Sequence, residues 1–171
     1  MRITHFCLAA VVVALGLAGC GADVVTLKVT ETGQAGGLAL QFPGMGNFGS
    51  SLGQALSKKD VNPKDVDSMK VKAVTLRLVS VGGLTDDLTF LDELSFLVTA
   101  DGLGSEVLAE RPSFSAGDRE VELQVAEDLE LKPFLSAGGM RIDVDASLAF
   151  PPPDVVDLEV TFKVRVNVNV I

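Results

Sequence analysis

Apolar and polar residues alternate along most of the chain, and the clearest run lies between 155 and 170. Every even position from Val156 to Val170 is apolar, and every odd position from Asp157 to Asn169 is polar. Because successive side chains of a strand point to opposite faces, this pattern predicts a strand with one buried and one wet face, as in antiparallel sheets. At about 3.3 Å per residue the run would reach roughly 50 Å. We therefore expect it to bend or to end early.

Seven further segments show the same alternation in a stronger or weaker form. They cover residues 24–30, 38–42, 69–81, 94–99, 105–110, 120–125 and 140–149. In the segment 69–81 the apolar residues move from odd to even positions at Ala73 and Val74, which predicts a β-bulge. Turn-forming residues such as Gly138 and Gly139 separate the segments.

Helical patterns are few and short. Phe48, Leu52 and Leu56 share one face of a predicted helix. Ser51 and Gln54 have the spacing of a capping box at the start of that helix.

Two further short turns are predicted at 128–135, where Pro133 limits the helix, and at 89–93. The whole pattern predicts an all-β fold, an antiparallel β-sandwich of about eight strands with one or two short helices. The sandwich could be immunoglobulin-like or jelly-roll-like, and the sequence leaves its strand order open.

The chain opens on an apolar segment that contains no acidic residue. Residues 6–17 are apolar apart from one glycine, and Arg2 precedes them. The run is shorter than the roughly 20 residues that a membrane-spanning helix needs, so it predicts a secretory signal. It ends in Leu17-Ala18-Gly19-Cys20, which resembles the lipobox of bacterial lipoproteins.

The resemblance implies cleavage before Cys20, diacylglycerol on its sulfur and acylation of the new N-terminus. It divides the chain into a signal peptide (1–19), a lipidated tether (20–23) and a single domain (24–171). In this family an Asp directly after the Cys tends to keep the protein in the inner membrane. Gly21 stands there instead, which favours the outer membrane in a cell that has one. Because two or more acyl chains bind a bilayer stably, we expect a lipid-anchored protein of the cell envelope.

Processing would remove much of the chemistry available to side chains. The chain has one His and two Cys, and it has no Trp or Tyr. His5 and Cys7 lie in the signal peptide, and Cys20 would carry the lipid. The mature chain would then lack the groups needed for a Ser-His-Asp or Cys-His pair and the usual ligands of zinc, copper and haem. No cofactor is predicted.

The charge balance is acidic. The formal net charge is −9, and removal of Arg2 from the 14 basic residues leaves 13 against 23 acidic ones. No basic stripe is visible along the sequence, so nucleic acid is not an expected partner.

Acidic residues offer the remaining candidates for chemistry. Four of them could hold Ca²⁺ through oxygen ligands, although their spacing differs from that of an EF-hand loop. These are Asp86, Asp87, Asp92 and Glu93. The pairs at 65/67 and 143/145 could act as acid and base on a sugar. The alternative interpretation is a solvated turn in the first case and the wet faces of strands in the others.

The segment 36–56 is both glycine-rich and apolar. Its residues Gly44-Met45-Gly46-Asn47-Phe48-Gly49 match the spacing of a dinucleotide-binding loop. No acid follows at the end of the next predicted strand and no further βαβ unit follows, which favours a flexible loop. Phe42, Met45 and Phe48 could form a lid over the core or an exposed surface for a partner or ligand.

Taken together, the sequence favours a membrane-anchored lipoprotein with a non-catalytic β-sandwich that serves as a structural or protein-interaction module. One alternative is a carrier that holds an apolar ligand or lipid between its sheets, gated by residues 36–56. Another is a Ca²⁺-dependent or carboxylate-only hydrolase.

Overall fold

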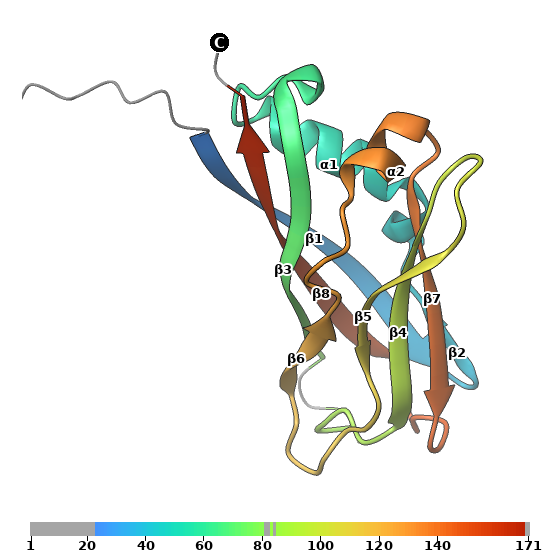
Figure 1. The fold of residues 1–171 in the computed structure, drawn as a ribbon. Helices are drawn as coiled ribbons and strands as arrows, with labels where there is room; N and C mark the ends of the chain where they lie inside the picture. Colours follow the sequence, from blue (N-terminus) through green and yellow to red (C-terminus); the bar gives the residue numbers. More distant parts are fainter. Residues whose placement is uncertain (1–22, 81–82, 84, 170–171) are drawn as a thin grey trace, which may run out of the picture.

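The computed structural model describes residues 23–80, 83 and 85–169, which form one antiparallel sheet of eight strands with two short helices (Figure 1). The strands are β1 (Asp23–Gly36), β2 (Ala39–Gln41), β3 (Val66–Leu78), β4 (Leu91–Thr99), β5 (Glu106–Arg111), β6 (Glu120–Val125), β7 (Arg141–Leu148) and β8 (Val156–Val168). The helices are α1 (Phe48–Ser57) and α2 (Lys132–Ala137), with 3-10 turns η1 (Pro43–Asn47) and η2 (Pro63–Asp65). The prediction of an antiparallel all-β fold with about eight strands and two short helices is confirmed.

The strand order is β2-β1-β8-β3-β6-β5-β4-β7. Strand β6 forms the corner of the sheet, because residues 120–123 pair with β3 whereas residues 124–125 pair with β5. The two halves of the sheet fold face to face (Figure 1), and Phe96 on β4 meets Phe162 on β8 with ring centroids 5.6 Å apart. The two layers are thus parts of one hydrogen-bonded sheet, unlike the two separate sheets of an immunoglobulin sandwich.

Strand β8 lies between β1 and β3 and follows the predicted alternation. Its even residues from Val156 to Val168 are all at most 8% exposed. On β3 the register against β8 shifts between Val71 and Ala73, which confirms the predicted bulge. Val170 lies outside the described residues.

Strand β1 is longer than the sequence indicated. It was predicted to end at Thr30, but it pairs with β8 as far as Ala35. The alternation is lost at Glu31 and Gly33, which occupy inward positions where an apolar residue was expected. Both are explained by contacts with the segment that follows β2.

That segment, η1 and α1, closes the open side of the fold between β1 and β7. The backbone N–H of Gly49 donates a 3.0 Å hydrogen bond to the carbonyl of Met140, next to β7. The Ser51 hydroxyl donates a 2.9 Å hydrogen bond to Glu31 Oε1 on β1. The segment 43–57 (the closing segment) is therefore fastened to β1 and to the residue that precedes β7.

Two local predictions need correction. Helix α1 begins at Phe48, after Asn47, so Ser51 lies within the helix and bonds Glu31 instead of forming a capping box with Gln54. The turn predicted at 89–93 ends by residue 90, because strand β4 begins at Leu91. The turn predicted at 128–135 becomes α2, in which proline occupies the first helical turn, where its missing N–H costs nothing.

Candidate functional site

The side of β1, β8 and β3 that points away from the core (the outer face) carries most of the polar side chains of these strands. Because the strands pair antiparallel and in register, these side chains form rows across the sheet. From the end where β8 begins, the rows are Gln34–Asp157, Thr32–Glu159–Arg77, Thr30–Thr161–Thr75, Lys28–Lys163–Ala73 and Thr26–Arg165–Lys70. Acidic and amide groups therefore give way to threonines and then to cations.

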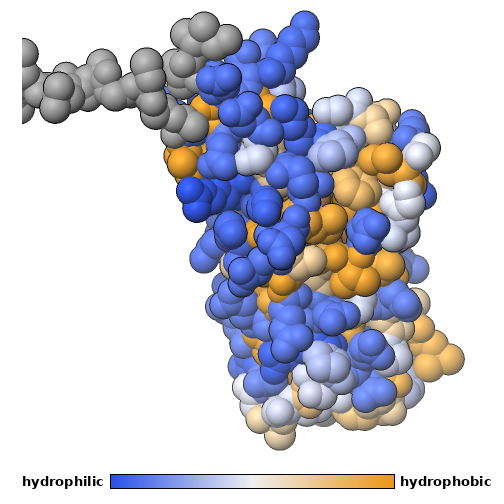
Figure 2. All heavy atoms as spheres, viewed as in Figure 1, coloured by the Kyte–Doolittle hydropathy of each residue, from blue (hydrophilic) through white to orange (hydrophobic). Residues whose placement is uncertain are grey.

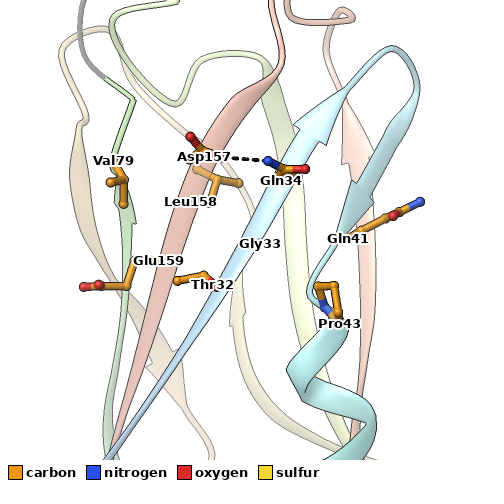
Figure 3. A pocket seen from close by; sticks show the side chains of 9 residues that line it. All are labelled: Thr32, Gly33, Gln34, Gln41, Pro43, Val79, Asp157, Leu158 and Glu159. Atoms are coloured by element: carbon orange, nitrogen blue, oxygen red, sulfur yellow. Dashed lines mark hydrogen bonds between the residues drawn. The ribbon is translucent and has the colours of Figure 1, made fainter.

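A groove of about 400 Å³ crosses the first two rows (Figure 3). Gln34 Nε2 donates a 2.8 Å hydrogen bond to Asp157 Oδ1, and Glu159 forms a 3.0 Å ion pair with Arg77. Pro43 and Val79 add apolar surface on opposite sides (Figure 3). Both carboxylates already have partners, so the groove can bind a small group but does not hold a free acid and base.

The last two rows form a cluster of cations. Lys28 lies directly opposite Lys163, and Lys70 lies opposite Arg165. The bulge in β3 adds Lys72, which is exposed. These five residues are the basic cluster.

Ion pairs are few in the basic cluster, although Glu120 and Glu159 line the same hollow as Lys28 and Lys163. Within the described residues, only Lys70 has a carboxylate within 4 Å, since its Nζ lies 3.9 Å from Oδ1 of the fully exposed Asp128. Exposed ion pairs of this kind contribute little. The cluster is thus a local excess of positive charge in a chain with a net negative charge. It was missed in the sequence because three strands that lie far apart along the chain contribute to it.

Exposed apolar side chains gather at the end of the molecule where β8 begins (the distal pole). The most exposed are Leu38 (85%) in the β1–β2 hairpin and Val155 (66%) just before β8. Val79, whose N–H donates to the carbonyl of Asp157 near the start of β8, and Phe150, in the loop between β7 and β8, are also exposed. Figure 2 shows hydrophobic atoms at the lower right, where Figure 1 places the hairpin. β1 begins and β8 ends at the opposite pole, where Asp23 pairs with Val168.

The predicted Ca²⁺ ligands are not brought together. In the part of the chain that the structure describes, no three His, Cys, Asp or Glu residues are placed to hold a metal ion. Asp87 accepts hydrogen bonds from the N–H of Gly117 (2.9 Å) and from the N–H and hydroxyl of Thr89 (3.1 and 2.5 Å). These bonds, that of Gly117 first, lower the pKa of Asp87 below its ordinary value of 3.8. Asp86, Asp92 and Glu93 are exposed.

The two acid pairs lie on solvated surfaces. Asp143 and Asp145 are both exposed on β7, and Asp143 accepts a 2.8 Å hydrogen bond from the Thr99 hydroxyl. Asp65 and Asp67 are exposed at η2 and the start of β3. Asp67, Asp143 and Asp145 thus lie on wet strand faces as expected, whereas Asp65 lies in the turn η2.

Phe42, Met45 and Phe48 belong to the core. They are 6%, 2% and 0% exposed. The ring of Phe48 packs edge-on against Phe162 at 4.9 Å, and that of Phe42 against Phe96 at 5.9 Å. This burial agrees with the interpretation as a lid, and these three side chains do not form an exposed surface, because they fill the space between the layers.

The glycines of the G-x-G-x-x-G match have a packing role. A Cβ at Gly44 would collide with the Glu31 carboxylate, and one at Gly49 would lie 2.9 Å from Met140 Cβ. Nothing lies within 4 Å of the equivalent position at Gly46. Two of the three glycines therefore let the closing segment approach β1 and the start of β7.

Comparison with protein-family models, with curated proteins and with solved structures finds no match to this chain. Among the described residues, no helix is long and apolar enough to cross a membrane. The lipobox lies outside the described residues, so lipidation of Cys20 remains a prediction. Function must be inferred from the sequence and the geometry of the domain.

Proposed function

We propose that this protein is a lipoprotein held on a cell-envelope membrane through Cys20, and that its β-domain is a non-catalytic module that binds another envelope protein at the distal pole. The observation that carries the proposal is the short distance along the chain between the lipobox and the domain. Strand β1 starts at Asp23, three residues after Cys20. Three residues span about 10 Å at most, so the anchor would hold the domain beside the headgroups.

The distal pole supports the second half of the proposal. Leu38 lies two residues after Gly36, which packs beside Val155, and exposed Val79 and Phe150 lie in segments at the same end. Apolar side chains gathered at one place on a surface mark contact sites more often than scattered ones do. Strand β1 has 14 residues and spans roughly 45 Å, so this end lies far along the domain from the anchor.

Neither alternative function has comparable support. A carrier of an apolar ligand would need space between the layers, and the rings of Phe48, Phe96 and Phe162 are in contact there. A hydrolase that uses only carboxylates would need two acids that face one substrate, and Asp157 and Glu159 in the largest groove of the outer face are already paired.

The anchor is tested with the full-length chain in a bacterial host that processes lipoproteins. We expect the wild-type protein in the membrane fraction, with the mass of residues 20–171 plus diacylglycerol and an acyl chain. Cys20→Ala should carry no lipid, whereas Cys7→Ala, which alters only the signal peptide, should be lipidated as the wild type is. A wild-type chain without lipid would refute the anchor.

The distal pole is tested by placing a photo-crosslinking residue at position 38 in the native host. We expect an adduct of one defined mass. A second chain carries the crosslinker at position 39, so that Leu38 is retained. In this chain Val155→Asp should abolish the adduct, whereas Ser105→Asp, at the other pole, should not. Because both positions are exposed, neither change should alter stability by more than about 0.5 kcal/mol. An adduct that survives Val155→Asp would contradict this assignment.

A further inference from the structure

We infer that the basic cluster docks on the phosphate groups of anionic phospholipids in the membrane that holds the anchor, so that the domain lies on its outer face. This inference rests on the proposed lipid anchor. It goes beyond that anchor, because an anchor alone leaves the domain free to stand upright or to tumble on its tether.

The first argument is the electrostatic repulsion among the cations of the basic cluster. Lysines placed directly opposite each other on paired strands repel, and Lys28 on β1 and Lys163 on β8 form such a pair. Arg165 lies two residues along β8 on the same face, opposite Lys70 of β3. The chain has more acids than bases, yet within the described residues these cations gain only the exposed Asp128. An anionic partner from outside would offset this repulsion.

The second argument is distance. Lys28 is five residues from the start of β1, and Arg165 is three residues from the end of β8. At about 3.3 Å per residue, these cations lie roughly 17 and 10 Å from the anchored pole. In an upright domain most of the cluster would lie beyond the Debye length of about 8 Å at physiological salt. A domain lying on its outer face would bring all five cations to the headgroups.

The third argument is the surface around the cluster. In the neighbouring row the hydroxyls of Thr30 and Thr161 share a 3.1 Å hydrogen bond, and Thr161 is buried. Thr30 and Thr75 are the members of this row whose hydroxyls can reach phosphate oxygens. Val24, 51% exposed, lies on the same face at the anchored pole, where it can enter the interface region. Figure 2 shows that the flank formed by β3 and β8 is largely hydrophilic. The face therefore suits headgroups and not the acyl region.

A membrane is favoured over an acidic protein because the tether holds it within about 10 Å at all times. Attachment through the anchor makes the second contact intramolecular, so weak electrostatic attraction suffices. Each Lys or Arg near an anionic membrane adds about a factor of five to binding, and the factors multiply.

The orientation is tested with the mature, lipidated protein in vesicles. After processing the chain has no free thiol, so one introduced cysteine can be labelled selectively. A fluorophore at Thr26→Cys sits on the outer face, and one at Ser95→Cys sits on the opposite layer. The vesicles contain a headgroup quencher and either phosphatidylcholine alone or about one third phosphatidylglycerol.

We expect the label at position 26 to be quenched several-fold more than that at 95 in the anionic vesicles. The difference should vanish in phosphatidylcholine and at about 1 M salt, where the Debye length falls to about 3 Å. The triple change Lys28→Gln, Lys163→Gln and Arg165→Gln should lower the ratio of docked to undocked protein about a hundredfold. The matched control is Lys58→Gln, Lys59→Gln and Lys64→Gln, which removes the same charge near the anchored pole and should leave the quenching unchanged.

The outcomes separate the two proposals. Equal quenching of both labels in a lipidated protein would overturn the docking and leave the anchor standing. A control triple that lowers the quenching more than the cluster triple does would have the same meaning, because it would indicate an upright domain. Docking that persists in phosphatidylcholine would also overturn it, since the contact would not be electrostatic. A mass spectrum without lipid on Cys20 would overturn both.

Discussion

Three positions in the region 33–49 require glycine, because another part of the chain occupies the space that a side chain would need. A Cβ at Gly33 would collide with the ring of Phe42, one at Gly44 with the Glu31 carboxylate, and one at Gly49 with Met140. Two of the three glycines in the G-x-G-x-x-G match, Gly44 and Gly49, are thus explained by where the closing segment touches the sheet, whereas Gly46 has open space around it.

Replacing these glycines should separate packing from ligand binding. Gly49→Ala should destabilise the fold by about 1–3 kcal/mol, because its Cβ would lie 2.9 Å from Met140 Cβ and 3.1 Å from the Met140 carbonyl oxygen. Gly46→Ala has open space and should change stability by less than about 0.5 kcal/mol. Urea unfolding measures both. Equal effects of the two changes would contradict the packing explanation.

Asp87 fastens the loop before β4 to Gly117 in the loop before β6. Its pKa is lowered in the folded state, so its charged form contributes stability above pH 3.8, and this contribution is lost as the pH falls through the lower folded pKa. Asp87→Ala should therefore cost about 1 kcal/mol near pH 6, a value kept low because the group is partly exposed. The difference from wild type should shrink below about pH 3.8.

Thermal unfolding between about pH 3 and pH 7 tests this prediction. Asp86→Ala is the matched control, since Asp86 is the exposed neighbour. A stability difference between Asp87→Ala and wild type that grows on acidification would contradict the expected sign of the pH dependence.

At the scale of elements, the closing segment shows what local sequence could and could not predict. The apolar face of α1, with Phe48, Leu52 and Leu56 all 0% exposed, follows from helical spacing alone. The start of the helix could not be predicted in this way, because the Ser51 hydroxyl donates to Glu31 on strand β1 and does not cap its own helix. Likewise the bulge in β3 was visible as a change of phase, whereas the last third of β1 depends on a distant partner, β8.

Phe48 provides a test of the closing segment as part of the core. Phe48→Ala should destabilise the protein by about 3–5 kcal/mol, since the ring is buried against Phe162 at 4.9 Å. Ser50→Ala, on the exposed side of the same helix, should have an effect below about 0.5 kcal/mol. Chemical denaturation compares the two. A cost below about 1 kcal/mol for Phe48→Ala would show that its ring is not packed as described.

At the scale of the whole molecule, the outer face could not be predicted from the sequence. Alternation assigns Lys163 and Arg165 to the wet side of a strand, and that part of the expectation is confirmed. It does not reveal that Lys28 and Lys70 lie beside them, because strand pairing joins residues more than 90 positions apart. The fold class can be predicted from local periodicity. The basic cluster can be recognised only when the pairing register of β1, β8 and β3 is known.

The central position of β8 makes a prediction about the whole sheet. A chain that stops after Val155, and so lacks β8, should show no cooperative thermal transition, because β1 and β3 would each lose the strand they pair with along most of their length. A chain from residue 21 to 171 is the control and should melt cooperatively. Circular dichroism follows both. A cooperative transition in the shortened chain would show that the other strands form a stable fold alone.

The order of synthesis adds a consequence in time. The strand at the middle of the β1-β8-β3 layer is the last of the eight to leave the ribosome. Until it has emerged, the first strand has no long partner, so the β1-β8-β3 layer cannot form. The proposed signal peptide would direct the chain to a channel that takes an unfolded polypeptide, and a domain completed only by its final strand would suit that passage.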